Sequence, residues 1–268
     1  MNNKIAIVTG GSSGIGRLIC NRLREHGCVV YAAALDDDLL AEVAADGILP
    51  LAVDTTDTQQ VNSAVSRVLQ EQDRIDILIN GASIATPGAV ECVPIDDVQR
   101  QFDINVFGYG RFMQAVLPAM RRQRSGRIVN ISSIAGFLST PVFGWYSASK
   151  FAIEGVSDAL RMEVAQFGID VVLIQPGLID TPFLAKQAKE MSRIDHPADY
   201  DEVVNALERL TRGGMDPNFV AKEVTRTAIM TNPPIRLQLP REPLEYSEIR
   251  RTQGDKALDD RLRRDLRL

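Results

Sequence analysis

The sequence predicts an α/β fold, namely a doubly wound parallel sheet of six to seven strands with helices on both faces. Over the first two-thirds of the chain, short apolar runs alternate with helix-length amphipathic segments. The first run is continuously apolar, as strands buried on both faces are. A glycine-rich turn follows it directly, which is typical of folds that bind nucleotides at the sheet edge.

Local signals mark the ends of the predicted elements. Gly27 ends the first helix, Asp54 follows the third strand, and Gly168 ends the fifth helix. Strands are expected over residues 5–8, 28–33, 49–53, 75–79, 127–131 and 171–174. Helices are expected over residues 15–25, 37–45, 57–70, 98–120 and 146–167. We expect Gly108 and Gly110 to interrupt the helix 98–120.

The sequence pattern changes beyond Thr181. Residues 182–214 are charged and partly apolar, without a strand pattern. Asp216 and Pro217 then predict the N-cap and first turn of a helix that runs to about Met230. Residues 235–239 predict an edge strand.

The C-terminal residues predict one more helix. Leucines recur every four residues from Leu258, and Asp259/Arg263 and Asp260/Arg264 are favourable i,i+4 pairs. This pattern favours a solvated tail helix over one that docks on a partner subunit.

Length and composition are those of one ordinary globular domain. The chain has 268 residues, of which 45% are hydrophobic and 24% charged. We therefore predict a single domain over 1–268, with a substrate lid near 183–215 and a C-terminal extension over 240–268. The net charge of −5 (30 basic and 35 acidic residues) argues against nucleic acid or an anionic membrane as partner.

The sequence also argues against several other classes. The three cysteines Cys20, Cys28 and Cys92 show no CxxC spacing, and the two histidines are too few for a histidine-rich metal centre. No apolar run approaches the roughly 20 residues of a membrane span, and no signal-peptide core follows Met1. We expect a cytoplasmic protein without a metal.

The first strand and first helix are joined by the turn Thr9-Gly10-Gly11-Ser12-Ser13-Gly14-Ile15-Gly16. Glycines permit a tight turn and the close approach of a diphosphate, which would bind the N–H groups that open the helix. The strand–turn–helix context predicts a Rossmann-type dinucleotide site. The spacing differs from GxGxxG, and a purely structural glycine turn is the alternative.

Two further strand ends offer ligand contacts. Asp54 could accept a hydrogen bond from an adenine amino group, or it could cap the loop before the next helix. After the fourth strand comes Asn80-Gly81-Ala82-Ser83, whose small residues leave room for a flat ring or a ribose.

Tyr146 and Lys150 are four residues apart on a predicted helix and therefore share one face. A nearby ammonium favours the phenolate, so we expect Lys150 to lower the pKa of Tyr146 from its ordinary value of about 10. A phenol whose pKa approaches neutrality can act as general acid or base in an alcohol–ketone interconversion. One such pair can arise by chance, so it needs support from other positions.

Two polar residues could provide that support. Ser133 follows the strand 127–131, so its hydroxyl could bind a substrate oxygen at the sheet edge, or it could cap a turn. Asn105 is a polar interruption of the helix 98–120 that could hold a water or bend the helix.

Together these positions resemble the short-chain dehydrogenase/reductase family over roughly residues 4–183. The motifs that resemble it, in chain order, are Thr9-Gly10-xxx-Gly14-x-Gly16, Asp54, Asn80-Gly81-Ala82, Asn105, Ser133, Tyr146-xxx-Lys150 and Pro176-Gly177-xxx-Thr181. The resemblance implies NAD or NADP as cofactor and hydride transfer to or from a carbonyl carbon. It also implies a homodimer or homotetramer.

The resemblance assigns roles to individual residues. Tyr146 becomes the proton donor or acceptor, and Ser133 steadies the substrate oxygen. Lys150 lowers the pKa of the tyrosine and holds the nicotinamide ribose, while Asn105 keeps a water in the proton relay. The implied cofactor contacts are Gly10, Ser12, Ser13, Gly14, Ile15, Gly16, Asp54, Asn80, Gly81, Ala82, Tyr146, Lys150, Pro176, Gly177, Ile179 and Thr181.

The chain departs from the family pattern in two places. Gly81 stands where the family usually has a second Asn. The second strand ends without the Asp typical of NAD users or the Arg typical of NADP users, and Ser13 replaces a basic residue that many NADP users carry. Because the carboxylates of residues 36–38 would repel a 2′-phosphate, the sequence favours NAD.

Apolar residues over 137–145 and 183–191 predict a pocket wall and a lid for a bulky apolar alcohol or ketone. The surrounding sequence resembles the hydroxysteroid and retinol dehydrogenases of the family. One alternative is a 3-oxoacyl thioester reductase, whose acidic carrier protein could bind a basic patch of Arg121, Arg122, Arg124 and Arg127. Another is a non-catalytic dinucleotide-sensing regulator, which need not retain Ser133, Tyr146 and Lys150.

Overall fold

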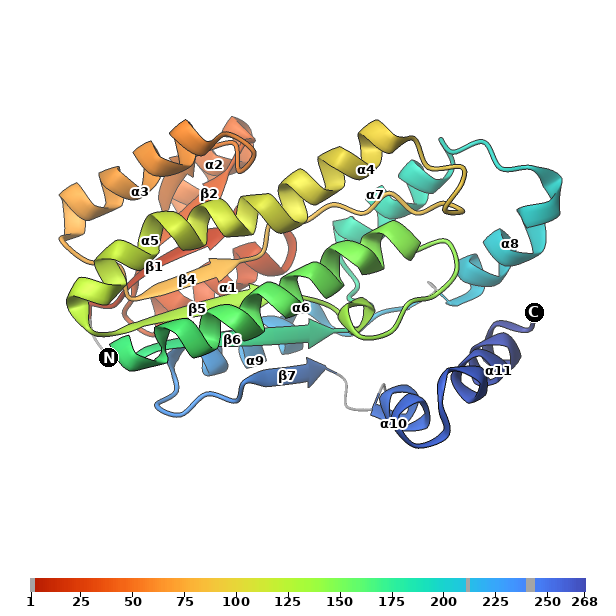
Figure 1. Ribbon diagram of the computed structural model, residues 1–268. Helices are drawn as coiled ribbons and strands as arrows, with labels where there is room; N and C mark the ends of the chain where they lie inside the picture. Colours follow the sequence, from red (N-terminus) through yellow and green to blue (C-terminus); the bar gives the residue numbers. More distant parts are fainter. Residues whose placement is uncertain (1–2, 211–212, 240–243) are drawn as a thin grey trace.

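A computed structural model describes residues 3–210, 213–239 and 244–268 of the chain. Its centre is a seven-stranded sheet with the strand order β3-β2-β1-β4-β5-β6-β7, parallel throughout (Figure 1). The strands are β1 (Ile5–Thr9), β2 (Val29–Ala34), β3 (Leu49–Ala52), β4 (Ile77–Asn80), β5 (Gly126–Ile131), β6 (Ile169–Pro176) and β7 (Arg236–Leu239). The predicted fold class is confirmed, and β7 lies at the sheet edge, as the sequence predicts.

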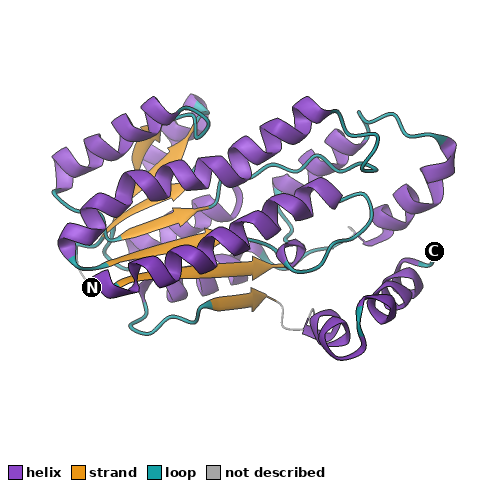
Figure 2. Cartoon of the chain, in the orientation of Figure 1, coloured by secondary structure: helices purple, strands orange, loops and turns teal. Residues whose placement is uncertain are grey.

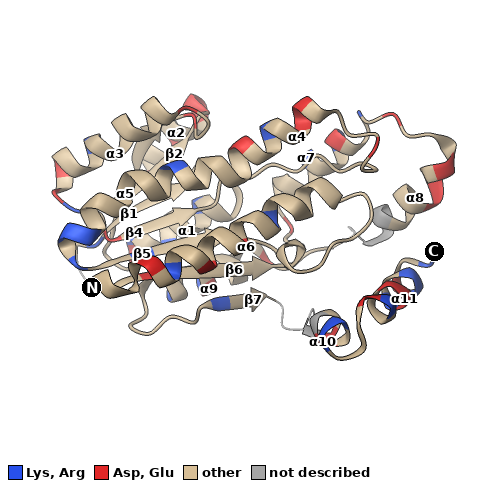
Figure 3. Ribbon diagram, viewed as in Figure 1, with Lys and Arg blue, Asp and Glu red and all other residues tan. Residues whose placement is uncertain are grey.

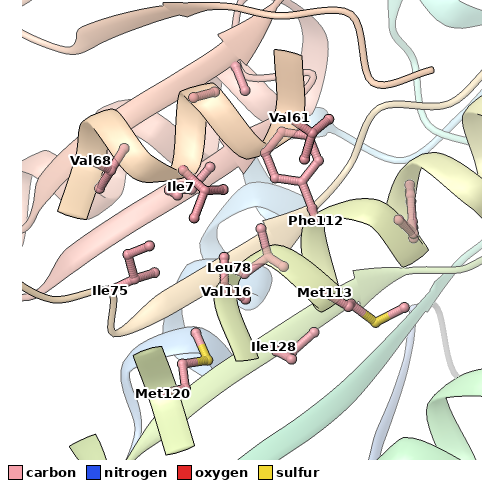
Figure 4. Close-up of a cluster of buried hydrophobic side chains, with 14 of the residues drawn as sticks. Ile7, Val61, Val68, Ile75, Leu78, Phe112, Met113, Val116, Met120 and Ile128 are labelled. Carbon is pink, nitrogen blue, oxygen red and sulfur yellow. The ribbon is translucent and has the colours of Figure 1, made fainter. Parts of the chain in front are cut away.

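Helices cover both faces of the sheet because its strands are apolar on both sides (Figure 2). One face is covered by α1 (Gly14–Glu25), α2 (Asp37–Ala45) and α9 (Pro217–Ile229). The other is covered by α3 (Thr58–Gln72), α5 (Tyr109–Gln123) and α6 (Gly144–Val164). On this second face, Ile7, Leu78 and Ile128 of the sheet lie in one buried cluster with Val61 of α3 and Phe112 of α5 (Figure 4).

The order in which the strands are added changes direction at β1, and this change determines where a ligand can bind. From β1 the chain proceeds outwards to β2 and β3 on one side and to β4 through β7 on the other. In such sheets, ligands bind where the carboxyl ends of the strands diverge. The glycine turn after β1 and the loops after β4, β5 and β6 all lie at this edge.

The predicted helix 98–120 is continuous through Gly108 and Gly110, so the expected interruption at the glycines is wrong. It comprises α4 (Ile95–Phe102), a π-helical segment (Asp103–Gly108) and α5. The irregularity is a change in hydrogen bonding around Asn105 and not a break at glycine, and π segments of this kind are frequent at functional sites.

The predicted lid contains α7 (Pro182–Met191) and α8 (Asp201–Leu210). Its residues 211–212 lie outside the described residues, as do residues 240–243 of the predicted extension. The predicted N-cap of α9 is confirmed, since the carboxylate of Asp216 accepts from the N–H of Asn218 at 2.8 Å.

The C-terminal extension forms α10 (Leu244–Gln253) and α11 (Asp255–Leu266). The expectation of a solvated tail helix is wrong for its leucine face, since Leu258 and Leu266 are buried and α11 contacts α10 and α8. The expected i,i+4 pairs are replaced by Lys256–Asp260 and Arg261–Asp265, each at 2.7 Å. Across the described residues, no helix is long and apolar enough to span a bilayer.

Candidate active site

A cavity of about 690 Å³ lies at the carboxyl edge of the sheet. The glycine turn, the loops after β4, β5 and β6, the start of α6 and one side of α7 line it. Most of the predicted site residues line this cavity, namely Gly10, Ser13, Gly14, Ile15, Gly16, Gly81, Ala82, Ser133, Tyr146, Lys150, Pro176, Gly177, Ile179 and Thr181.

In the glycine turn, two backbone segments lie too close together for a side chain to fit between them. A Cβ at Gly16 would lie 2.1 Å from the carbonyl oxygen of Gly10, so no other residue fits there without a shift of the backbone. Ser13 precedes α1 without capping it through its side chain. The first N–H groups of α1 are therefore suited to an anion such as a diphosphate.

Thr9 fixes the turn to the neighbouring strand end. Its hydroxyl oxygen accepts from the N–H groups of Gly81 (3.0 Å) and Ala82 (3.1 Å). The two loops that would hold a dinucleotide are thus held at a set separation.

Tyr146 and Lys150 lie on the first turns of α6 and face the end of β5. The hydroxyls of Ser133 and Ser83 lie near the phenol of Tyr146, close enough to affect its pKa. The ammonium of Lys150 donates to the carbonyl oxygen of Ile131 (3.0 Å) and lies 5.6 Å from the centre of the Tyr146 ring. The hydroxyl of Tyr109 donates to the same carbonyl oxygen at 3.1 Å.

The electrostatics of this pair differ from the expectation. Burial raises the pKa of Tyr146 to about 12, and the nearby hydroxyls of Ser133 and Ser83 offset only part of that rise. Burial also lowers the pKa of Lys150 to about 7, against the opposing effect of the Glu154 carboxylate. Burial is the largest cause of the Tyr146 shift and Lys150 is not among the groups that lower it, so the predicted lowering of the tyrosine pKa by Lys150 is wrong for this structure.

Ser133 caps a turn, which is one of the two interpretations of its sequence position. Its hydroxyl oxygen accepts from the N–H of Ala135 (3.1 Å), which caps the 3₁₀ turn Ile134–Gly136, and it donates to the carbonyl oxygen of Pro176 (3.3 Å). The same hydroxyl lies on the cavity wall beside Tyr146.

Asn105 lies behind the cavity wall. Its Oδ1 accepts from the hydroxyl of Ser83 (3.0 Å) and the N–H of Ile84 (2.9 Å). Its Nδ2 donates to the carbonyl oxygen of Ile84 (2.8 Å) and the hydroxyl of Ser149 (3.1 Å). The amide therefore holds Ser83 against Tyr146. Sequence reasoning noted Ser83 only as a small residue after the fourth strand and assigned it no role at the site.

Three predicted cofactor contacts lie away from the cavity: Ser12, Asp54 and Asn80. Asp54 instead accepts from the N–H (2.8 Å) and hydroxyl (2.7 Å) of Thr56, which is the loop-capping alternative. Asn80 is fully buried and donates to Asn130 at 2.8 Å, tying β4 to β5. The side chains of Asp54 and Asn80 thus have protein partners, and Ser12 lies outside the cavity lining.

Aromatic side chains surround the phenol of Tyr146. The ring centre of Phe143 lies 6.0 Å and that of Phe183 6.4 Å from its ring centre. Segments 137–145 and 183–191, the predicted wall and lid, both contribute lining residues. Trp145 does not line the cavity and donates its indole N–H to the carbonyl oxygen of Val90 at 3.1 Å.

The predicted basic patch lies at the end of α5, where the strands of the sheet begin, and thus on the opposite side of the sheet from the cavity (Figure 3). Arg127 is buried there, with an ion pair to Asp170 at 2.7 Å and hydrogen bonds to carbonyl oxygens at the end of α9. Arg121 and Arg124 lie over the ring of Phe167. Among the described residues, no group of three His, Cys, Asp or Glu side chains could hold a metal ion.

Comparison with known proteins identifies related sequences. A family model described as short chain dehydrogenase matches residues 4–192. A 3-ketodihydrosphingosine reductase of Bacteroides thetaiotaomicron is 36% identical, over 89% of this chain and 88% of its own. An NADPH-dependent 3-dehydrocapnine reductase of Ornithobacterium rhinotracheale is 30% identical over 98% of both chains.

Solved structures agree with these sequence matches. A short-chain dehydrogenase from Streptomyces avermitilis superposes with a TM-score of 0.84 at 30% identity, over 98% of both chains. One from Burkholderia cenocepacia, in complex with NADP, gives 0.78 at 23% identity over 97% of this chain and 98% of its own. The chain belongs to the short-chain dehydrogenase/reductase family and is an oxidoreductase of CH–OH or carbonyl groups.

Proposed function

We propose that the chain reduces a ketone on a bulky apolar molecule to the secondary alcohol, with Tyr146 as the general acid. The observation that supports this most is the contact of Tyr146 with Ser133 on the wall of a cavity that continues to the glycine turn. The names of the two relatives above, both reductases, agree with this direction.

The residues of the site fit a nicotinamide dinucleotide, since the unblocked start of α1 suits a diphosphate and the residue-16 position admits only glycine. When bound, a reduced nicotinamide supplies the hydride that adds to the carbonyl carbon. Ser133 and Tyr146 would hydrogen-bond the carbonyl oxygen and orient it. Because burial raises the pKa of Tyr146 to about 12, the phenol keeps its proton at neutral pH and can donate it to the forming alkoxide.

Cofactor preference rests on opposing observations. Asp37 and Asp38 lie in the first turn of α2, beside the N-cap Asp36, and disfavour a 2′-phosphate. One relative is named as NADPH-dependent, and one similar structure contains NADP. We propose that these carboxylates reduce the use of NADP(H) without abolishing it, so that both cofactors support turnover.

The carrier-protein interpretation loses its main support, because the basic patch lies at the edge of the sheet away from the cavity. The retained Ser133, Tyr146 and Lys150 favour an enzyme over a regulator that only senses nucleotide.

We also propose a homodimer or homotetramer, supported by apolar side chains that are exposed on α6, such as Val156 and Met162.

The test is a panel of long-chain ketones assayed by absorbance of NADH and NADPH in parallel. We expect Tyr146→Phe to lower turnover by roughly 10²- to 10⁴-fold and to leave the Kd for nucleotide within about threefold. Tyr246→Phe is the matched control, since its hydroxyl bonds Asp265 on the C-terminal extension. Unchanged rates in Tyr146→Phe would refute the assigned role.

A further inference from the structure

The wall of the cavity changes from apolar to polar along α7. Near Tyr146 its wall is apolar, with Phe183 and Leu184. One helical turn after Phe183 comes Gln187, and then Glu190. α4 lies at the same end of the molecule (Figure 1) and contributes charged side chains to the far wall. The cavity therefore has one apolar end and one polar end.

The polar end carries an excess of positive charge. Four cations line it (Arg100, Lys186, Lys189 and Arg193) against two carboxylates (Asp97 and Glu190), so its net charge is 4 − 2 = +2. Arg193 contacts both carboxylates, at 3.1 Å and 2.8 Å. Within the described chain, the other three cations have no carboxylate within ion-pair distance.

Gln187 provides a second, independent observation. Its side chain is only 7% exposed and lies on the cavity wall. Its amide oxygen Oε1 receives no hydrogen bond from any described residue. A buried acceptor without a donor is costly, so this oxygen is suited to an N–H or O–H group of a bound molecule.

We propose that this polar end binds the head group of the ketone substrate, and that the head group combines an anion with a hydrogen-bond donor. Arg100, Lys186 and Lys189 would bind the anion, for which a phosphate monoester is the simplest example. Gln187 would accept from the donor. The inference rests on the proposed function, because the ketone would lie at Tyr146 and the apolar chain along Phe183 and Leu184.

The charge part is tested by binding, with saturating oxidised cofactor present so that the nucleotide site is filled. Fluorescence of Trp145, the single tryptophan, reports the binding of dodecyl phosphate and of uncharged dodecanol. We expect at least roughly tenfold tighter binding of the phosphate, decreasing as ionic strength rises. The triple variant Arg100→Met/Lys186→Met/Lys189→Met should lose this preference, and Lys222→Met, an exposed control on α9, should keep it.

The donor part is tested with two probes that differ by one N–H group: the dodecanoyl amide of phosphoethanolamine and the corresponding ester. Wild-type protein should bind the amide about three- to tenfold more tightly. Gln187→Leu should bind both equally, while Gln187→Asn should recover part of the preference.

Two results would overturn the inference: equal affinity for dodecyl phosphate and dodecanol, or a preference unchanged in the triple variant. Displacement of the cofactor by the phosphate would also overturn it, because the anion would then occupy the nucleotide site. Turnover separates this failure from that of the proposed function. If an uncharged ketone is reduced but the anionic one is not preferred, the head-group inference fails alone.

The anion could come from coenzyme A or from a small phosphate head, and substrates distinguish these sources. Reduction of a 3-oxoacyl coenzyme A in preference to a phosphorylated ketone of equal chain length would assign the polar end to the coenzyme. The reverse preference would assign it to a small amphiphile. Higher kcat/KM for 3-ketodihydrosphingosine than for both would contradict the requirement for an anion.

Discussion

The substitution Lys150→Met tests how strongly burial disfavours the charged amine of Lys150. The test compares the free energy of unfolding of wild type with that of the variant as pH changes. Methionine keeps the length of the apolar stem, so the main change is the loss of the titratable amine. Lys150 is 1% exposed, and burial lowers its pKa from 10.5 to about 7. At about 1.4 kcal/mol per pKa unit, the shift corresponds to about 5 kcal/mol of destabilisation where both states are protonated.

The direction in which stability changes with pH follows from how many protons the folded and unfolded states bind. Below about pH 7 the folded protein must bury a charge. Between about pH 7 and 10.5 the folded state holds a neutral amine while the unfolded state still binds a proton, so the penalty falls as pH rises. Relative to Lys150→Met, the free energy of unfolding of wild type should therefore rise by about 2 kcal/mol between pH 7 and pH 9.

The assay is urea unfolding of the cofactor-free protein, followed by circular dichroism at several pH values. Loss of the hydrogen bond to Ile131 adds an offset of about 1 kcal/mol that does not vary with pH. Lys222→Met, whose ammonium is exposed, should give a difference that is flat with pH. A flat difference for Lys150→Met as well would refute the idea that burial controls this amine.

Three further predictions concern other parts of the fold. Asp37→Asn with Asp38→Asn should raise the ratio of kcat/KM for NADPH to that for NADH by about three- to tenfold, and an unchanged ratio would show that these carboxylates do not face the ribose. Gly16→Ala should weaken nucleotide binding by at least roughly tenfold, because its Cβ would overlap the Gly10 carbonyl oxygen; calorimetry showing wild-type Kd would contradict the turn geometry. Arg127→Leu should lower the free energy of unfolding by about 3 kcal/mol in urea, since it leaves carbonyl oxygens at the end of α9 without their donor, and a loss below about 0.5 kcal/mol would contradict that role.

Sequence reasoning succeeded where the chemistry is local. The glycine turn sits between a strand and a helix, and Tyr146 and Lys150 are one helical turn apart, so adjacent residues determine their arrangement. The direction of a side chain at a strand end was harder to predict. Asp54 and Asn80 lie at the predicted edge, but Asp54 bonds Thr56 of its own loop and Asn80 bonds Asn130 of the next strand.

Properties that depend on the assembled core could not be predicted. The pKa of Tyr146 depends on how completely the fold excludes water, which no spacing reveals. The ion pair of Arg193 with Asp97 joins residues that are 96 positions apart, so the polar end of the cavity exists only once the residues after α7 contact α4.

The carbonyl oxygen of Ile131 has a consequence for how this enzyme can vary. It receives hydrogen bonds from both Lys150 and Tyr109, so a peptide group of the sheet sets the position of the site amine. Substitution cannot delete a main-chain acceptor, and residue 131 can therefore change in size without releasing the lysine. Diversification is consequently left to the surrounding loops, which can change while the position of Lys150 at the end of β5 stays the same.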